Sequence, residues 1–125
     1  MPDEITKVVL TDKLAMFEEP WSPRIVAELN GQHVKVAKLA GEFVWHEHEA
    51  EDELFLVLSG RLRMELVDRT IELGPGELVV IPRGVLHRPV AIDGECAVLL
   101  FEPASTVNTG SAPEDPRTRT LLERI

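Results

Sequence analysis

The sequence is poor in cysteine, in aromatic residues and in long apolar runs. It contains a single cysteine, no tyrosine, four Phe and two Trp residues. One cysteine, Cys96, excludes an internal disulfide, and its place in an alternating apolar segment predicts a buried thiol. No segment approaches the roughly 20 apolar residues that span a bilayer, and the amino terminus MPDEITK lacks the plan of a secretory signal. We therefore expect a soluble, cytoplasmic protein with no membrane partner.

Positive charge is also scarce. The 13 Lys and Arg residues face 22 Asp and Glu residues, which gives a formal net charge of -9. Nucleic-acid binding proteins normally carry a basic patch, and the basic residues here are scattered. We expect no nucleic-acid partner. The 125 residues fit one domain with one core, which Leu, Val and Ile must largely fill because rings are so few.

Short strand-like segments follow one another from residue 24 onward. The dipeptide Asn30-Gly31 stands between two of them and is the strongest short-range signal for a hairpin. Residues 53–58 are expected to end in a turn at Ser59-Gly60. A short helix is predicted over residues 11–17, capped by Thr11 or Asp12. The expected strands cover residues 24–29, 33–39, 53–58, 61–67, 70–73, 78–82 and 96–102.

This pattern predicts an all-β fold. Many short strands with no helix long enough for a crossover are typical of an antiparallel sandwich or barrel. We assign residues 1–103 to a single barrel with N-terminal strands. Residues 104–125, rich in Ser, Thr, Gly and Pro, are expected to form a surface-wrapping or mobile C-terminal tail that ends in a short helix over residues 120–125.

Candidate metal ligands occur in the stretch WHEHEAEDELFLVLSG, residues 45–60. His46 and His48 are two residues apart, so in extended chain both imidazoles lie on one face. Glu53 starts the next strand, and two imidazoles with a carboxylate form a ligand set for a first-row metal. Asp52 is a weaker rival to Glu53. His87 is a fourth candidate, because it ends the segment GELVVIPRGVLH, where proline and glycine restrict the backbone.

The two segments resemble the two sequence blocks of the cupin family. The first block is Gly, a short spacer, His-x-His, three or four residues, Glu, six residues and Gly; it is matched by Gly41, His46, His48, Glu53 and Gly60. The second is Gly, five residues, Pro-x-Gly, two residues and His; it is matched by Gly76, Pro82, Gly84 and His87. Two positions depart from the pattern, since four residues follow Gly41 where five are usual and Ala91 stands where the family has Asn.

The resemblance implies a double-stranded β-helix, a jelly-roll cupin barrel, with the two blocks covering residues 41–87. It also implies one divalent transition metal ion, Zn, Fe, Ni or Mn, held by His46, His48, Glu53 and His87. Electrostatics also favours a divalent cation at this site, because burying an ionised Glu53 inside an aliphatic barrel would cost several kcal/mol without one. The alternatives are a solvated acidic loop for His46 and His48, and a histidine bound to backbone at the barrel mouth for His87.

The leading functional hypothesis is a metal-dependent enzyme acting on a small polar organic substrate, either a sugar-derivative isomerase or a dioxygenase. The alternative is a non-catalytic sensor or binding module for a small molecule or metal. A metal-free structural barrel is a third interpretation, disfavoured because the complete ligand set would then have no purpose.

Several other residues have two interpretations each. Trp45 and Phe55 either line a substrate pocket or pack in the core. Arg63 and Arg83 could hold an anionic substrate, although a solvated strand face and a turn are their expected places. His33 is expected to be a surface or sheet-packing residue.

The segment ELFLVL, residues 53–58, carries apolar side chains on both faces. Both faces of such a strand are expected to pack against other parts of the protein or a partner. One cover is the barrel core, and we expect the other to be a second copy of the chain, in a homodimer.

Overall fold

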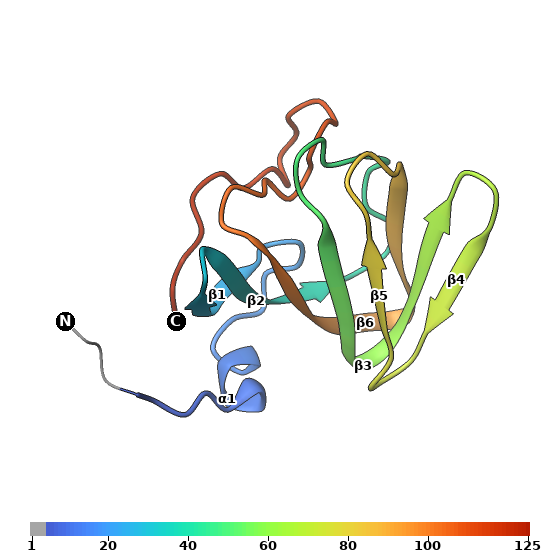
Figure 1. Ribbon diagram of the computed structural model, residues 1–125. Helices are drawn as coiled ribbons and strands as arrows, with labels where there is room; N and C mark the ends of the chain where they lie inside the picture. Colours follow the sequence, from blue (N-terminus) through green and yellow to red (C-terminus); the bar gives the residue numbers. More distant parts are fainter. Residues whose placement is uncertain (1–4) are drawn as a thin grey trace.

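The computed structural model describes residues 5–125 and shows one short helix followed by strands that wrap into a barrel (Figure 1). The elements are α1 (Leu10–Leu14), β1 (Arg24–Leu29), β2 (Gln32–Leu39), β3 (Glu53–Leu66), β4 (Thr70–Leu73), β5 (Leu78–Ile81) and β6 (His87–Pro103). The strands pair in the order β1-β2-β6-β3-β4, and β5 also pairs with β3. Every pairing is antiparallel.

The helix α1 is shorter than predicted and begins one residue earlier. Its N-cap is Val9, which makes no side-chain capping bond, so neither Thr11 nor Asp12 caps it. The backbone bond from Lys13 N–H to the Val9 carbonyl, 3.1 Å long, closes its first turn. In the part of the chain that the structure describes, no helix has the length and apolar character needed to cross a membrane.

The hairpin predicted at Asn30-Gly31 is confirmed. Both residues have positive φ, 50° and 73°, as a two-residue turn between twisted strands requires. Leu29 pairs with Gln32 directly beside the turn, which fixes the register of β1 on β2. The hairpin then joins the barrel through the pairing of β2 with β6.

The turn predicted at Ser59-Gly60 is wrong. β3 continues through both residues to Leu66, and the pairing register with β6 shifts on either side of Ser59. Gly60 has φ 81°, and a Cβ at this position would lie 2.4 Å from the Glu95 carbonyl oxygen. Glycine here permits a bulge that bends one strand around a barrel corner, because the partner strand passes too close for any side chain.

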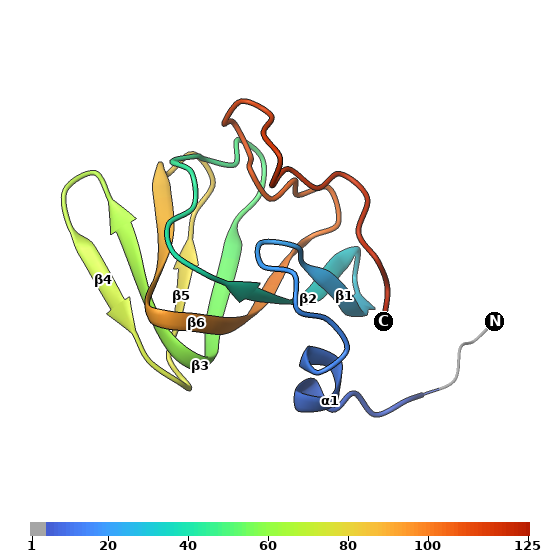
Figure 2. The same cartoon turned by 180° about the vertical axis from the view of Figure 1, so that it is seen from behind.

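The strand predicted over residues 96–102 is only the second half of β6, which begins at His87. Asp93 and Gly94, with φ 59° and 103°, bend the strand opposite the bulge in β3. The sequence there is typical of a turn, yet both halves of β6 pair with β3. These two long bent strands give the molecule its curved, closed shape (Figure 2).

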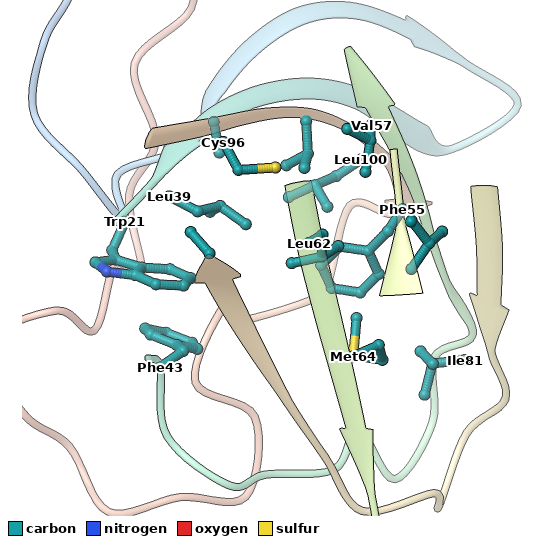
Figure 3. Packing of buried hydrophobic residues seen from close by; sticks show 14 residues of the cluster. Trp21, Leu39, Phe43, Phe55, Val57, Leu62, Met64, Ile81, Cys96 and Leu100 are labelled. Carbon is teal, nitrogen blue, oxygen red and sulfur yellow. The ribbon is translucent and has the colours of Figure 1, made fainter. Parts of the chain in front are cut away.

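The core fills the barrel and is mainly aliphatic, as the composition predicts. Figure 3 shows Leu62, Met64, Val57 and Leu100 packed together, with Trp21 and Phe43 stacked at one side. Cys96 lies within this cluster and is fully buried. The predicted buried thiol is confirmed, and burial raises its pKa to about 11.

The segment 104–125 crosses the end of the barrel where the link between β2 and β3 also lies (Figures 1 and 2). It contains no helix over residues 120–125, in contrast to the prediction. Instead the end of the chain adds to the hairpin: Ile25 N–H donates to the Glu123 carbonyl at 2.9 Å, and Ile125 N–H donates to the Ile25 carbonyl at 3.0 Å. These backbone bonds replace the ones that a terminal helix would make within itself.

Candidate metal centre

The four predicted ligands come from three places in the chain that meet near one end of the barrel. His46 and His48 lie in the link between β2 and β3, Glu53 is the first residue of β3, and His87 is the first residue of β6. A backbone bridge ties two of these places together, because His46 and His87 exchange N–H to carbonyl bonds of 2.9 Å in both directions. The pairing sets the two imidazoles side by side, with ring centroids 4.3 Å apart.

The side chains converge on a single point. One donor atom from each of His46, His48, Glu53 and His87 lies within 4.8 Å of all the others. Glu53 Oε1 is 3.3 Å from His48 Nε2 and 3.5 Å from His87 Nε2. All four residues are buried. The spacing that sequence alone suggested therefore corresponds to a compact cluster.

Hydrogen bonds to backbone fix the tautomer of two imidazoles. His46 Nδ1 lies 2.9 Å from the Val44 carbonyl, and His87 Nδ1 lies 2.9 Å from the Val85 carbonyl. A carbonyl oxygen can only accept, so each Nδ1 carries the proton and donates it. Each Nε2 is then left with a free lone pair that points into the cluster, which is the arrangement found in metal-binding histidines.

Several polar atoms in the cluster lack any hydrogen-bond partner within the protein. They are His48 Nε2, His87 Nε2 and Glu53 Oε1, all fully buried. Buried polar atoms without partners are rare in folded proteins, because each costs about 1–3 kcal/mol. A cation among them would satisfy all three at once, so the residues present fit a divalent metal.

The ionisation of the cluster also suits a metal. Burial, reinforced by the neighbouring His87, lowers the pKa of His46 to about 4, so its imidazole is neutral at physiological pH. Burial alone would raise the pKa of Glu53, but the influence of the neighbouring Glu102, His48 and His87 outweighs burial and holds that pKa well below its usual range. A neutral imidazole and an ionised carboxylate are the forms that bind transition metals.

Behind Glu53 lies a buried ion pair that the sequence analysis missed. Lys35 Nζ donates to Glu102 Oε1 at 2.8 Å, and both side chains are only 2% exposed. Burial and the charge of Glu53 raise the pKa of Glu102 well above its usual range. The ammonium of Lys35 opposes that rise and holds Glu102 in place beside Glu53. A signal existed, because Lys35 is two residues before Ala37 and so shares its inward face.

A mostly apolar cavity adjoins the cluster through His46 and Glu53. Its volume is about 30 Å³, room for about one water molecule. Its other lining residues are Trp21, Pro23, Ala37, Leu39, Phe43, Phe55, Pro89, Leu100 and Asn108. Of the two rings proposed from sequence, Phe55 lines this cavity, whereas Trp45 does not.

The remaining candidates lie away from the cluster. Asp52 is exposed and accepts hydrogen bonds from Arg83, the backbone N–H at 2.9 Å and Nε–H at 3.2 Å, so it does not compete with Glu53. Trp45 is 39% exposed, with the Arg88 guanidinium 5.4 Å from its ring centroid. Arg63 pairs with Glu65 on β3. Neither Arg63 nor Arg83 lines the cavity.

His33 is a sheet-packing residue, as predicted. It is buried in β2, with Nε2 3.5 Å from Glu28 Oε2. Burial, together with the charge of nearby Lys35, lowers its pKa. It takes no part in the ligand cluster.

The C-terminal segment touches the ligand-bearing link directly. Ser111 N–H donates to the Glu47 carbonyl at 2.9 Å, and the Glu47 N–H donates to Ser111 Oγ at 3.0 Å. A Cβ on Gly110 would lie 2.3 Å from the Glu47 carbonyl oxygen and 3.1 Å from His46 Cδ2. The segment is thus packed against the link between two of the ligands, which sequence reasoning did not foresee.

Comparison with known proteins places these features in a family. The model of the cupin domain family matches residues 32–102. A cupin-2 domain containing protein from Shewanella frigidimarina NCIMB 400 is 45% identical, with a TM-score of 0.75 over 77% of this chain and 93% of that one. Protein NMB1881 from Neisseria meningitidis is 28% identical, with a TM-score of 0.72 over 78% of this chain and 99% of that one. The predicted all-β jelly-roll barrel is confirmed by these structures.

A curated relative is also similar. The uncharacterized protein YdbB of Bacillus subtilis (strain 168) is 39% identical over 64 residues, which are 50% of this chain. The match spans 57% of YdbB, little more than half of its length.

Proposed function

Because the chain belongs to the cupin domain family, we propose that it is a metal-dependent enzyme that holds one divalent transition metal on His46, His48, Glu53 and His87. The observation that carries this proposal is the set of three buried donor atoms that have no partner within the protein. A barrel built only for stability would be expected to replace them with apolar groups. Iron, zinc, nickel and manganese all suit this ligand set.

The proposed substrate is a small organic molecule that presents an oxygen atom to the site. A metal bound here would supply Lewis-acid chemistry by polarising that oxygen, as in isomerases, or redox chemistry, as in dioxygenases. The protein's own residues hold the proposed metal ligands in position. The Val44 and Val85 carbonyls fix the imidazoles of His46 and His87, the buried Lys35–Glu102 pair lies beside the carboxylate of Glu53, and the apolar walls exclude water.

A sensor or binding module is the second candidate, and one observation favours it. Among the residues that line the cavity, His46 and Glu53 are the only ones with titratable side chains. Both are proposed metal ligands, so general acid–base catalysis would need a group from the substrate or the metal. Binding of a small molecule without turnover over hours would favour this candidate.

Elemental analysis tests the proposal most directly. Protein purified without a polyhistidine tag or chelator is expected to contain about one equivalent of a transition metal by plasma mass spectrometry. Iron would direct substrate screening toward reactions that consume oxygen, and zinc, nickel or manganese toward isomerisation. Less than about a tenth of an equivalent, with no uptake on titration, would contradict the metal-dependent function.

The proposed assembly is a homodimer formed through the outer face of β5. Leu78 and Val80 on that strand are 56% and 49% exposed, and Leu86 beyond it is 40% exposed. We expect light scattering to give about twice the 14.0 kDa of one chain. Val80→Lys should shift the protein toward the monomer, because it would bury a charge at the interface. A mass of one chain at high concentration would contradict the dimer.

A further inference from the structure

The link that carries His46 and His48 is held on one edge by residues 84–87. His46 and His87 exchange backbone bonds, and Gly84 N–H donates to the His48 carbonyl at 2.9 Å. Successive residues of an extended chain present their backbone groups to opposite edges. Residues 46 and 48 therefore face the same edge, and the backbone N–H and carbonyl of the residue between them face the other.

The C-terminal segment binds that second edge. Ser111 N–H donates to the Glu47 carbonyl at 2.9 Å, and Glu47 N–H donates to Ser111 Oγ at 3.0 Å, so both backbone groups of Glu47 have partners there. The segment crosses the end of the barrel (Figures 1 and 2) and lies outside residues 32–102, which match the family model. The backbone between the two ligands is thus held by a part of the chain that lies beyond the matched domain.

Gly110 lets the C-terminal segment approach the link more closely than a residue with a side chain could. Its φ is 50°, and a Cβ at this position would lie 2.3 Å from the Glu47 carbonyl oxygen and 3.1 Å from His46 Cδ2. Contacts as short as the first of these cannot persist, so an added methyl group must displace either the segment or the link.

The C-terminal segment is anchored on both sides of this glycine. The preceding residue, Thr109, is 1% exposed, and the Asn108 side-chain amide donates to the Arg117 carbonyl at 2.8 Å. Arg117 Nη1–H in turn donates to the Glu42 carbonyl at 3.1 Å, near the start of the link. A side chain on residue 110 would therefore press on the link between the two ligands, because the segment beneath it is held in place.

We infer that the C-terminal segment is part of the metal centre, because Gly110 and Ser111 hold the backbone from which His46 and His48 project. Resting on the proposed function, this inference assigns Gly110 and Ser111 as positioning residues of the same site. They act through the link and touch no metal themselves. Residues that orient metal ligands typically change metal affinity by about 10- to 100-fold when they are replaced. The segment is therefore expected to raise the affinity of the four ligands for the metal.

A pair of glycine variants tests the inference. Gly110→Ala adds a methyl group against the link and is expected to weaken zinc binding on the order of 10-fold, measured by isothermal titration of the metal-free protein. Gly76→Ala is the matched control. Gly76 also has a left-handed φ, 82°, but apart from its chain neighbours no atom of the described residues lies within 4 Å of an added Cβ. It should lose stability through backbone strain and keep the parent's zinc affinity. Equal zinc affinities for the two variants would overturn the inference.

Cobalt gives a readout that a merely structural role would not change. The visible absorption of bound Co²⁺ depends on the geometry of its ligands. With each protein saturated with Co²⁺, the spectrum of Gly110→Ala is expected to differ from that of the parent, and the spectrum of Gly76→Ala is expected to match it. Identical spectra for all three proteins would mean that Gly110 does not position the ligands, and the inference would fail.

The Ser111 hydroxyl supplies a second test, which decides the matter if Gly110→Ala does not fold. Ser111→Ala removes the acceptor for Glu47 N–H and should weaken zinc binding by a factor of about 2–10, whereas Ser111→Thr keeps the hydroxyl and should bind zinc like the parent. Equal zinc affinities for these two variants would overturn the assignment of Ser111. Zinc titration of the parent separates this inference from the proposed function. If the parent binds zinc and neither Gly110→Ala nor Ser111→Ala weakens it, this inference alone fails, whereas no zinc uptake by the parent overturns both.

Discussion

Replacing Lys35 with methionine is expected to destabilise the protein by about 3–5 kcal/mol, because it leaves the carboxyl of Glu102 buried without its cation. Lys35 and Glu102 are each only 2% exposed, and their charged atoms are 2.8 Å apart. Glu102 also faces Glu53, so the loss of the lysine would leave two carboxyl groups together inside the barrel. Chemical denaturation of chelator-treated protein measures the change in the free energy of unfolding.

Two variants make this prediction specific. Lys38→Met changes a lysine on the same strand whose amine donates one hydrogen bond, to the Phe17 carbonyl, and it should cost only about 1 kcal/mol. The double variant Lys35→Met/Glu102→Gln removes the buried charge and leaves a neutral amide beside Glu53, and it should recover most of the lost stability. If Lys35→Met costs no more than Lys38→Met, the buried pair does not have the proposed effect.

The sequence predicted which side chains would cluster better than it predicted the strands. The ligands follow from local rules, since a two-residue period aligns His46 with His48 and the two family blocks locate Glu53 and His87. The hairpin at Asn30-Gly31 is equally local. Each of these features depends on residues close in sequence, which is why they could be recognised without knowing which strands pair.

The features that were missed depend on distant partners. Gly60 and Gly94 have the sequence character of turns, but each lies at a bend where a long strand continues around the barrel, and only the neighbouring strand shows this. The ion pair joins residues 67 positions apart, across the pairing of β2 with β6. The C-terminal segment lies over the ligand link through Gly110 and Ser111, whose role no local pattern indicates.

Replacing His48 with alanine is expected to weaken zinc binding by more than about 100-fold, because loss of a ligand should exceed the 10- to 100-fold effect typical of residues that merely support ligands. Isothermal titration of the metal-free protein measures the affinity. Glu49→Ala is the matched control, since it changes the adjacent, exposed residue and should leave zinc affinity unchanged. Full metal occupancy in the His48→Ala protein would refute the ligand assignment.

His48 is the most informative ligand to remove because the fold depends on it least. His46 and His87 are tied to carbonyls through Nδ1 and to each other through backbone bonds, whereas Nε2 of His48 has no hydrogen-bond partner in the protein. Metal-free His48→Ala should therefore unfold much like the metal-free parent. In the parent, zinc at 100 times its dissociation constant should add about 2.7 kcal/mol to the free energy of unfolding. In the variant, the same zinc concentration should add little, which separates a lost ligand from a damaged fold.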